Sequence, residues 1–158
     1  MAKGDMFLLV EGKMTGVIKG ESVDSARAGE IDITGWSWGM ESQAAMPGAG
    51  SGLKTSLSQL RISKLVDRAS TALMTVMRTN EVIKRAVLTV RKAGKVPIDY
   101  FTLTIRDGRI ASHEVGSSGG PELVEQLSIA FEKIEVEYFE QDEKGAKKGG
   151  MSFAAEVR

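Results

Sequence analysis

Two short motifs in the chain could do chemistry, but each lacks a residue that the chemistry needs. His113-Glu114 begins like a metalloprotease zinc motif, yet the required second histidine is absent, because His113 is the only histidine in the chain. We therefore interpret His113 as a structural residue of a strand. Residues 48–55 are similar to a phosphate-binding loop, but Leu53 interrupts the required Gly-Lys-Thr run. Nucleotide binding is therefore not expected.

A third candidate is a series of carboxylates near the C-terminus, of the kind that glycosidases use in pairs. The series consists of Glu132, Glu135, Glu137 and Glu140. Glu135 and Glu137 alternate with Val136 and Tyr138, so they are best explained as the solvated face of a strand. Serines are numerous, but none has a base of known geometry beside it. We expect no catalytic residue, no metal and no cofactor, and we do not expect an enzyme.

The hydrophobic spacing predicts strands almost throughout, with one helix. Strands are expected at residues 6–10, 57–62, 86–91, 100–106, 127–138 (with a change of phase inside it) and 152–157. Ala93-Gly94 and Asp107-Gly108 are typical turn pairs. The helix follows an N-cap at Ser70 or Thr71 and stops near Asn80. These elements predict a mainly β fold, a barrel or sandwich with one plugging or flanking α-helix.

The segment from residue 31 to residue 40 predicts a crossing between sheets. Trp36 and Trp38 share one face of a strand, whereas Ile31 and Ile33 have the opposite parity. The phase changes at residues 34–35, where Gly35 favours a bulge or sharp bend. A strand that leaves one sheet and enters another has this pattern.

Two glycine-rich segments are candidates for contacts. Residues 39–54 form a long loop whose hydrophobic content favours ordering against a partner. Its candidate assembly residues are Met40, Met46, Gly48, Gly50 and Gly52. Residues 116–120 form a small polar loop, which is either a flexible connection or a surface kept small so that something can pass close by.

Composition indicates a single domain spanning residues 1–158, with 42% hydrophobic residues and no cysteine. The absence of cysteine excludes disulfides, thiolate catalysis and cysteine-ligated zinc. No hydrophobic run approaches the ~18 residues of a membrane span, so no membrane insertion is expected. The first residues do not read as a signal peptide, which predicts folding in the cytoplasm without export by the general secretory route.

The net charge is zero, but the charges are segregated along the chain. Residues 54–109 hold 12 Lys and Arg against 4 Asp and Glu, a net charge of +8. Residues 110–143 hold 1 Lys against 9 Glu and Asp, a net charge of −8. Either basic and acidic strands are neighbours in one sheet, or opposite sides of the subunit meet head to tail in a ring. Nucleic-acid binding is disfavoured, because the acidic half would repel phosphate.

Several motifs, in this order and spacing, resemble the haemolysin-coregulated proteins (Hcp) of bacterial type VI secretion systems. They are Gly20-Glu21-Ser22, Ile31-Asp32-Ile33, Trp36-Ser37-Trp38-Gly39-Met40, Thr71-Ala72-Leu73-Met74, Leu88-Thr89-Val90-Arg91-Lys92-Ala93-Gly94, and residues 100–105, 116–120 and 127–138. The sequence Ala-Met-Pro-Gly at 45–48 and the short end 153–158 depart from the family pattern.

The resemblance implies a β-barrel of two packed antiparallel sheets with one flanking α-helix. Such subunits form homohexameric rings that stack into the inner tube, which a sheath propels with its spike. The tube protein assembles in the cytoplasm and is then secreted into the extracellular space or a target cell, and its lumen can carry and chaperone small effectors. Ser37 and Ser118 match family positions on the inner wall. Two other interpretations stay open: a phage-type tail-tube protein, and a small hydrolase or lectin-like β-sandwich that binds a ligand at loop 39–54.

Overall fold

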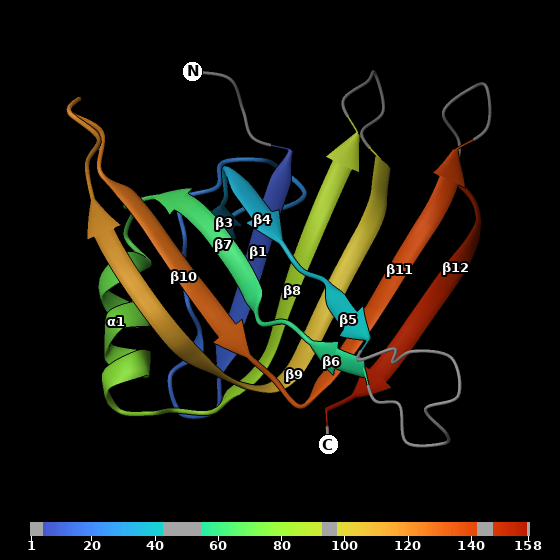
Figure 1. The fold of residues 1–158 in the computed structure, drawn as a ribbon. Coiled ribbons are helices and arrows are strands. Elements are labelled where there is room, and N and C mark those ends of the chain that lie inside the picture. The colour runs from blue at the N-terminus through green and yellow to red at the C-terminus, as the bar shows by residue number, and fades with distance from the viewer. Residues whose placement is uncertain (1–4, 43–54, 93–97, 142–146, 158) are drawn as a thin grey trace.

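The structure is a computed structural model that describes residues 5–42, 55–92, 98–141 and 147–157 (Figure 1). These residues form twelve strands and one helix, which confirms the expected mainly β fold with a single helix. In chain order the elements are β1 (Met6–Gly12), β2 (Gly16–Val17), β3 (Ile31–Asp32), β4 (Gly35–Ser37), β5 (Met40–Ser42), β6 (Thr55–Leu57), β7 (Leu60–Leu65), α1 (Ser70–Arg78), β8 (Ile83–Lys92), β9 (Ile98–Gly116), β10 (Val124–Ala130), β11 (Lys133–Gln141) and β12 (Lys147–Glu156).

Two antiparallel sheets pack face to face and share the long strand β9. The larger sheet runs β2-β1-β8-β9-β11-β12, with β3 beside β1. The smaller sheet runs β9-β10-β7-β4. The N-terminal part of β9 pairs with β8 and β11, and its C-terminal part pairs with β10. One strand therefore passes from one sheet to the other, which closes this side of the barrel.

The predicted turn at Asp107-Gly108 is wrong, because the chain bends there and continues as the same strand. Asp107 has a positive φ of 53°, which asparagine and aspartate tolerate better than most residues. A Cβ at position 108 would lie 2.7 Å from the carbonyl oxygen of Ala130, so only glycine fits. The pair therefore produces the bend that moves β9 between sheets.

The predicted sheet crossing at residues 34–35 is confirmed. Ile31 in β3 pairs with Leu8 of the larger sheet, whereas Trp36 in β4 pairs with Ile62 of the smaller one. A second crossing corrects the expectation of one strand over residues 127–138. That segment is two strands in different sheets, β10 and β11, and the change of phase marks the passage between them.

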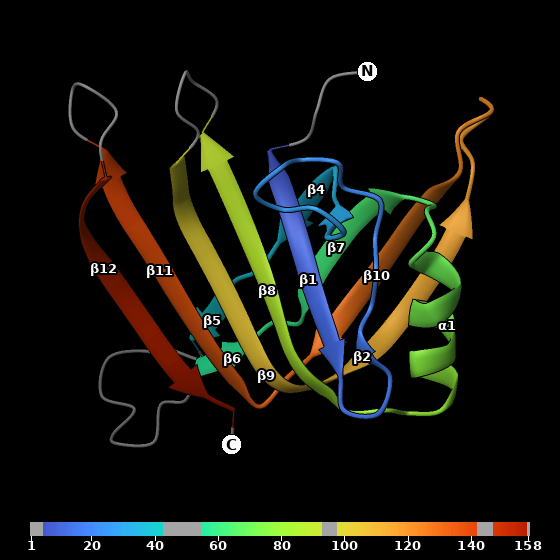
Figure 2. The same ribbon diagram turned by 180° about the vertical axis from the view of Figure 1, so that it is seen from behind.

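The helix α1 packs at one side of the barrel, as Figures 1 and 2 show from opposite directions. Its predicted end is confirmed, because Asn80 has the left-handed φ of 56° that stops a helix. The predicted N-cap is wrong: the cap position is Ala69, without a side-chain hydrogen bond. Ser70 lies one residue later, and its hydroxyl is engaged in a buried cluster described below.

The core lies between the two sheets and under the helix. Its fully buried side chains include Leu8, Leu60, Leu73, Leu88, Leu103, Ile105 and Ile129. Residues 18–30 cover the outer face of β1 and β8 (Figure 2), where Asp24 accepts two hydrogen bonds from the guanidinium of Arg91 at 2.9 and 2.5 Å. A Cβ at Gly20 would lie 2.4 Å from the Glu30 carbonyl oxygen, so this close approach of the chain requires glycine.

Candidate functional site

The outer face of the smaller sheet is polar and rich in serine. Ser37 of β4 pairs with Arg61 of β7, Arg61 pairs with Ser128 of β10, and Ser128 pairs with Ser112 of β9. The next row adds Ser63, Gln126 and Glu114. These residues together, called the serine face below, are Ser37, Arg61, Ser63, Ser112, Glu114, Gln126 and Ser128. They line a shallow open hollow of about 400 Å³.

The serine face offers small hydroxyls, which suit weak polar contacts. The hydroxyls of Ser112 and Ser128 lie 2.5 Å apart and bond to each other. Among the residues lining the hollow, His113 is the one histidine, and its Nε2 lies 2.7 Å from Glu125 Oε2. In the described part of the chain, no hydrogen bond joins one of these serines to a histidine, lysine or carboxylate that could activate it.

The two residues predicted to face the lumen, Ser37 and Ser118, lie in different parts of the structure. Ser37 is exposed on the serine face and lines its hollow. Ser118 is exposed in the loop between β9 and β10 and does not line that hollow. The sequence analysis missed Ser112, Ser128 and Gln126. For Gln126 and Ser128, alternation in β10 with the inward-facing Leu127 and Ile129 is the signal that could have found them.

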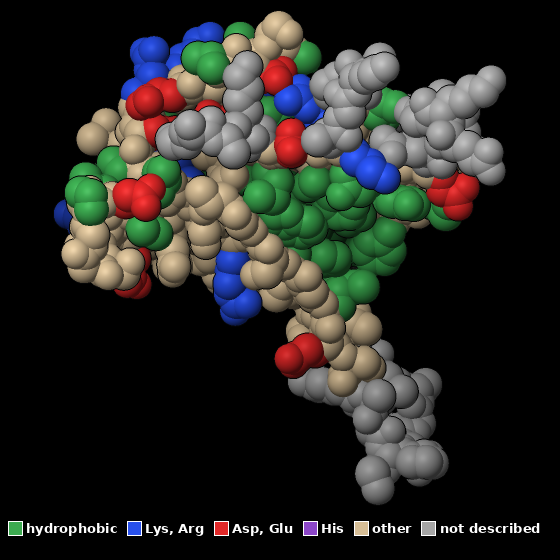
Figure 3. All heavy atoms as spheres, turned by 90° about the horizontal axis from the view of Figure 1, so that it is seen from above, with side chains coloured by type: hydrophobic (Ala, Val, Ile, Leu, Met, Phe, Trp, Pro, Cys, Tyr) green, Lys and Arg blue, Asp and Glu red, His purple; other side chains and the backbone are tan. Residues whose placement is uncertain are grey.

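A two-stranded ribbon begins where the predicted assembly loop begins. β5 and β6 pair with each other, and Met40 lies opposite Leu57. Gly39 and Ser58 fix the base of the ribbon, because each backbone N–H donates to the other residue, at 2.9 Å. Figure 3 shows the ribbon projecting from the body of the subunit. Met40 is half exposed, whereas Met46, Gly48, Gly50 and Gly52 lie outside the described residues.

The inner face of the larger sheet is hydrophobic even at β11 and β12, where the smaller sheet no longer covers it. Leu88, Leu103, Val136 and Phe153 form one row across β8, β9, β11 and β12, and the next row ends in Tyr138 and Met151. Exposure rises along these rows, from 0% at Leu103 to 40% at Phe153.

The uncovered end of these rows is called the open apolar face below and consists of Val136, Tyr138, Met151 and Phe153. Trp38 lies at its border, with its ring centroid 6.4 Å from that of Phe153. Figure 3 shows hydrophobic side chains gathered on this side of the subunit, next to the projecting ribbon. Exposed side chains of this size at the end of a core indicate a surface that a partner covers.

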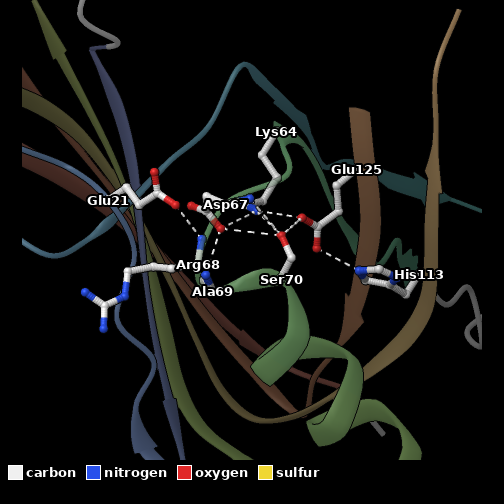
Figure 4. A network of polar contacts seen from close by, with 8 residues as sticks. All are labelled: Glu21, Lys64, Asp67, Arg68, Ala69, Ser70, His113 and Glu125. Atoms are coloured by element: carbon white, nitrogen blue, oxygen red, sulfur yellow. Dashed lines mark hydrogen bonds and ion pairs between the residues drawn. The ribbon is translucent and has the colours of Figure 1, made fainter. Parts of the chain in front are cut away.

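A buried ionic cluster joins the smaller sheet to the helix (Figure 4). The Nζ of Lys64 in β7 lies 2.6 Å from Glu125 Oε1 in β10, and both side chains are completely buried. The same Nζ lies 2.8 Å from Asp67 Oδ1 and 3.2 Å from the hydroxyl of Ser70. Ser70 in turn donates to Glu125 Oε1 at 2.5 Å. Each buried charge therefore has an opposite charge and further hydrogen bonds.

The lone histidine contributes to this cluster. Nε2 of His113 lies 2.7 Å from Glu125 Oε2, and its side chain is nearly buried. Ser70 beside Lys64 has the residue types of a nucleophile and its base, but Ser70 is 1% exposed, so no substrate can reach it. Within the described ranges, no three His, Asp or Glu side chains gather to hold a metal ion.

Sequence analysis missed the Lys64–Glu125 pair, although the strand pattern carried a signal. Leu60, Ile62 and Lys64 share one face of β7, and Glu125 shares its face with Leu127. Both charges therefore occupy inward positions. The Lys64–Glu125 pair also tests the two explanations of the segregated charges. So does a second pair, in which Arg106 Nε of β9 lies 3.5 Å from Glu135 Oε1 of β11. For these pairs the first interpretation is confirmed: basic and acidic strands are neighbours within the subunit.

Stability is expected to fall in acid because of Glu125. Burial raises the pKa of its carboxyl, but hydrogen bonds from Lys64, Ser70 and His113 outweigh burial and hold the pKa below its usual value. A lowered pKa stabilises the fold above the unfolded pKa of about 4.5, and this stabilisation is lost as the pH falls through the folded pKa. Thermal midpoints at pH 7, 5, 4 and 3 should decline, and Glu125→Gln should decline less steeply. Equal declines would contradict the assignment to Glu125.

Comparison with known proteins identifies the family. The sequence profile described as "Type VI secretion system effector, Hcp" matches residues 7–138, most of the chain. The chain belongs to the Hcp family. A curated Hcp relative, protein hcp1 of Pseudomonas aeruginosa, is 35% identical over 150 residues, which cover 92% of this chain and 90% of the relative.

Solved structures of Hcp-type proteins share the whole architecture. A type VI secretion system effector from Yersinia pestis superposes with a TM-score of 0.78 at 25% identity, covering 97% of this chain and 100% of the other. Hcp1 from Salmonella typhimurium gives 0.74 at 27% identity, covering 96% and 95%. The expected Hcp-like barrel is therefore confirmed.

Membership of the Hcp family makes the protein a tube subunit of a type VI secretion system. The family is a structural and secreted one. No helix among the described residues is long and apolar enough to cross a membrane. The family match favours the Hcp interpretation over the phage-type tube protein and the ligand-binding sandwich.

Proposed function

We propose that this protein forms homohexameric rings with the serine face turned toward the bore, and that the rings stack into the inner tube of the secretion system. The hollowed serine face carries the proposal. It is a four-stranded surface of four hydroxyls, one guanidinium, one carboxamide and one carboxylate, and most of it is exposed, although Ser128 is 7% exposed. A transport lumen needs weak and reversible contacts, and a wall of polar side chains provides them without an adhesive hydrophobic patch.

Neighbouring subunits in the ring meet at the open apolar face. Tyr138, Met151 and Phe153 are 43%, 53% and 40% exposed, and a second copy of the chain would remove them from water. A closed ring requires a head-to-tail contact, so a different surface of the next subunit covers this face. The β5–β6 ribbon, with Met40, is adjacent to it, and Met46, Gly48, Gly50 and Gly52 are the further assembly candidates of the same loop.

The proposed role is structural, with no catalysis, cofactor or metal. Small effectors are carried and chaperoned in the bore, where Ser37 lies on the wall and Ser118 lies at the loop of the β9–β10 hairpin. The sheath surrounds the tube, and the spike lies at its end. Rings assemble in the cytoplasm and leave the cell with the tube, into the extracellular space or a target cell.

The orientation of the serine face can be tested by labelling, because the chain has no cysteine of its own. Ser37→Cys and Ser118→Cys, each labelled with a maleimide heavy-atom cluster, are expected to give density inside the bore in electron micrographs of rings. Ser152→Cys is the matched control: Ser152 is exposed on the outer face of the larger sheet, opposite Glu137. Its label should appear on the outer circumference.

The labelling separates the two parts of the proposal. Intact rings with the Ser37 label on the circumference would contradict the orientation and leave the ring itself standing. A Ser118 label outside the bore would remove that residue alone from the lumen.

A further inference from the structure

The most exposed large hydrophobic side chain of the described residues is Met14, at 87%. It lies in the tight turn between β1 and β2, at the lower end of the barrel in Figures 1 and 2. Val17, just after the turn, is 43% exposed. A single exposed methionine is ordinary on a protein surface. What distinguishes Met14 is the way its backbone is held.

One carboxylate fixes this turn. Glu81 Oε2 accepts hydrogen bonds from the backbone N–H groups of Met14 and Thr15, at 2.9 and 2.7 Å. Its Oε1 accepts from the hydroxyl of Thr15 at 2.7 Å. Lys13 adds a backbone bond to the carbonyl of Val82 at 2.9 Å. The turn is therefore tied to the segment after the helix, and its methionine is held away from the body instead of folding back onto it.

The opposite end of the same barrel also carries exposed hydrophobic side chains. Val23 is 80% exposed in the segment 18–30. Val115 and Leu123, at 42% and 55%, flank the loop between β9 and β10. Figures 1 and 2 both show these segments at the upper end, across the length of the strands from the β1–β2 turn.

The charged neighbours of these side chains are complementary. Lys13 precedes Met14 in the turn and is exposed. At the other end, Glu114 precedes Val115 and Glu122 precedes Leu123, and both glutamates are exposed. Glu81 also lies at the Met14 turn, but both of its oxygens accept hydrogen bonds from the turn itself. Lys13 is left to meet the carboxylates at the other end, which favours a head-to-tail contact over a like-with-like one.

We propose that the turn of residues 13–16 is a contact between stacked rings, in which Met14 packs on the end of a subunit in the next ring that carries Val23, Val115 and Leu123. The inference rests on the proposed ring. Glu81 is a positioning residue, because it fixes the turn without contacting the neighbouring ring. The partner is a second copy of this chain, and the contact is heterologous, so stacking continues without closing.

Cross-linking of the otherwise cysteine-free full chain tests the contact. Met14→Cys is combined in one chain with Val23→Cys or with Leu123→Cys, and a short bismaleimide is added to purified rings. At least one pairing is expected to give a ladder of bands beyond six chains on denaturing gels. Each single variant should give no such ladder, because a head-to-tail stack does not bring two copies of position 14 together.

Glu81→Ala provides an independent variant in the cross-linking pair. It leaves Met14 in place but removes the three hydrogen bonds of the turn, so the yield of the ladder should fall at least several-fold while the ring mass stays unchanged. Intact rings without a ladder in either pairing would overturn the stacking contact. A Met14→Cys ladder as strong as that of the pairs would also overturn it. Loss of the rings themselves in the parent protein would instead count against the proposed function.

Discussion

Replacing Lys64 with methionine is expected to lower the free energy of unfolding by about 3–5 kcal/mol. Lys64 is completely buried, and its Nζ lies 2.6 Å from the equally buried Glu125 and 2.8 Å from Asp67. Methionine keeps most of the volume but leaves the Glu125 carboxylate buried without its cation. The hydrogen bonds from Ser70 and His113 compensate only part of that loss. Urea unfolding followed by circular dichroism measures the effect.

The double variant Lys64→Met/Glu125→Leu distinguishes a buried charge from lost packing. Because it removes both charges, it should be clearly more stable than Lys64→Met alone. Both variants are best compared in a monomeric background, such as the Phe153→Asp variant below, because ring assembly itself adds apparent stability. A single variant that costs less than about 1 kcal/mol would show that the cluster does not join the helix to the sheet in the way we infer.

Replacing Phe153 with aspartate is expected to convert rings into folded monomers. Phe153 lies on the open apolar face, 40% exposed and in contact with Trp38. A carboxylate there would be desolvated by the neighbouring subunit without a partner, which costs at least ~2 kcal/mol per contact, or a ~30-fold weaker contact. Because every subunit contact in the ring carries the change, assembly should fail at micromolar concentration. Light scattering gives the mass, and circular dichroism tests whether the barrel is intact.

Ser152→Asp is the matched control for Phe153→Asp. Ser152 is the preceding residue of β12, exposed on the opposite face of the sheet, so its variant should keep the ring. Met151→Asp is a second variant on the open apolar face, in case Phe153→Asp unfolds the subunit. Intact rings in both face variants would contradict the assignment of this face to the ring contact.

Strand alternation predicted much of this fold, because a half-buried strand shows its two faces in the sequence. The phase change at Gly35 gave a sheet crossing that the structure confirms. The predicted turn at Asp107-Gly108 was wrong, because the same two residue types occur both in turns and in bends within a strand. Sequence spacing does not tell whether the chain reverses its direction there. Residues 127–138 were predicted as one strand for a similar reason. The change of phase in the hydrophobic alternation is the same whether a strand contains a bulge or the chain passes into another sheet.

The candidate site was less predictable, because it depends on which strands are neighbours. Ser37 could be singled out from the sequence, but Ser112 and Ser128 join it only through the pairing of β10 with β9 and β7. Lys64 and Glu125 are far apart in the chain, and only that same pairing places them side by side. The pairing register of two strands that are distant in the chain cannot be predicted from the sequence of either strand alone.

The mass of the purified protein tests the central claim most directly. Light scattering at micromolar concentration and ordinary salt should give about six times the 17.0 kDa chain mass, or a multiple of that value where rings stack. A clean monomer at 17.0 kDa under the same conditions would contradict the proposal that this chain is a ring-forming tube subunit.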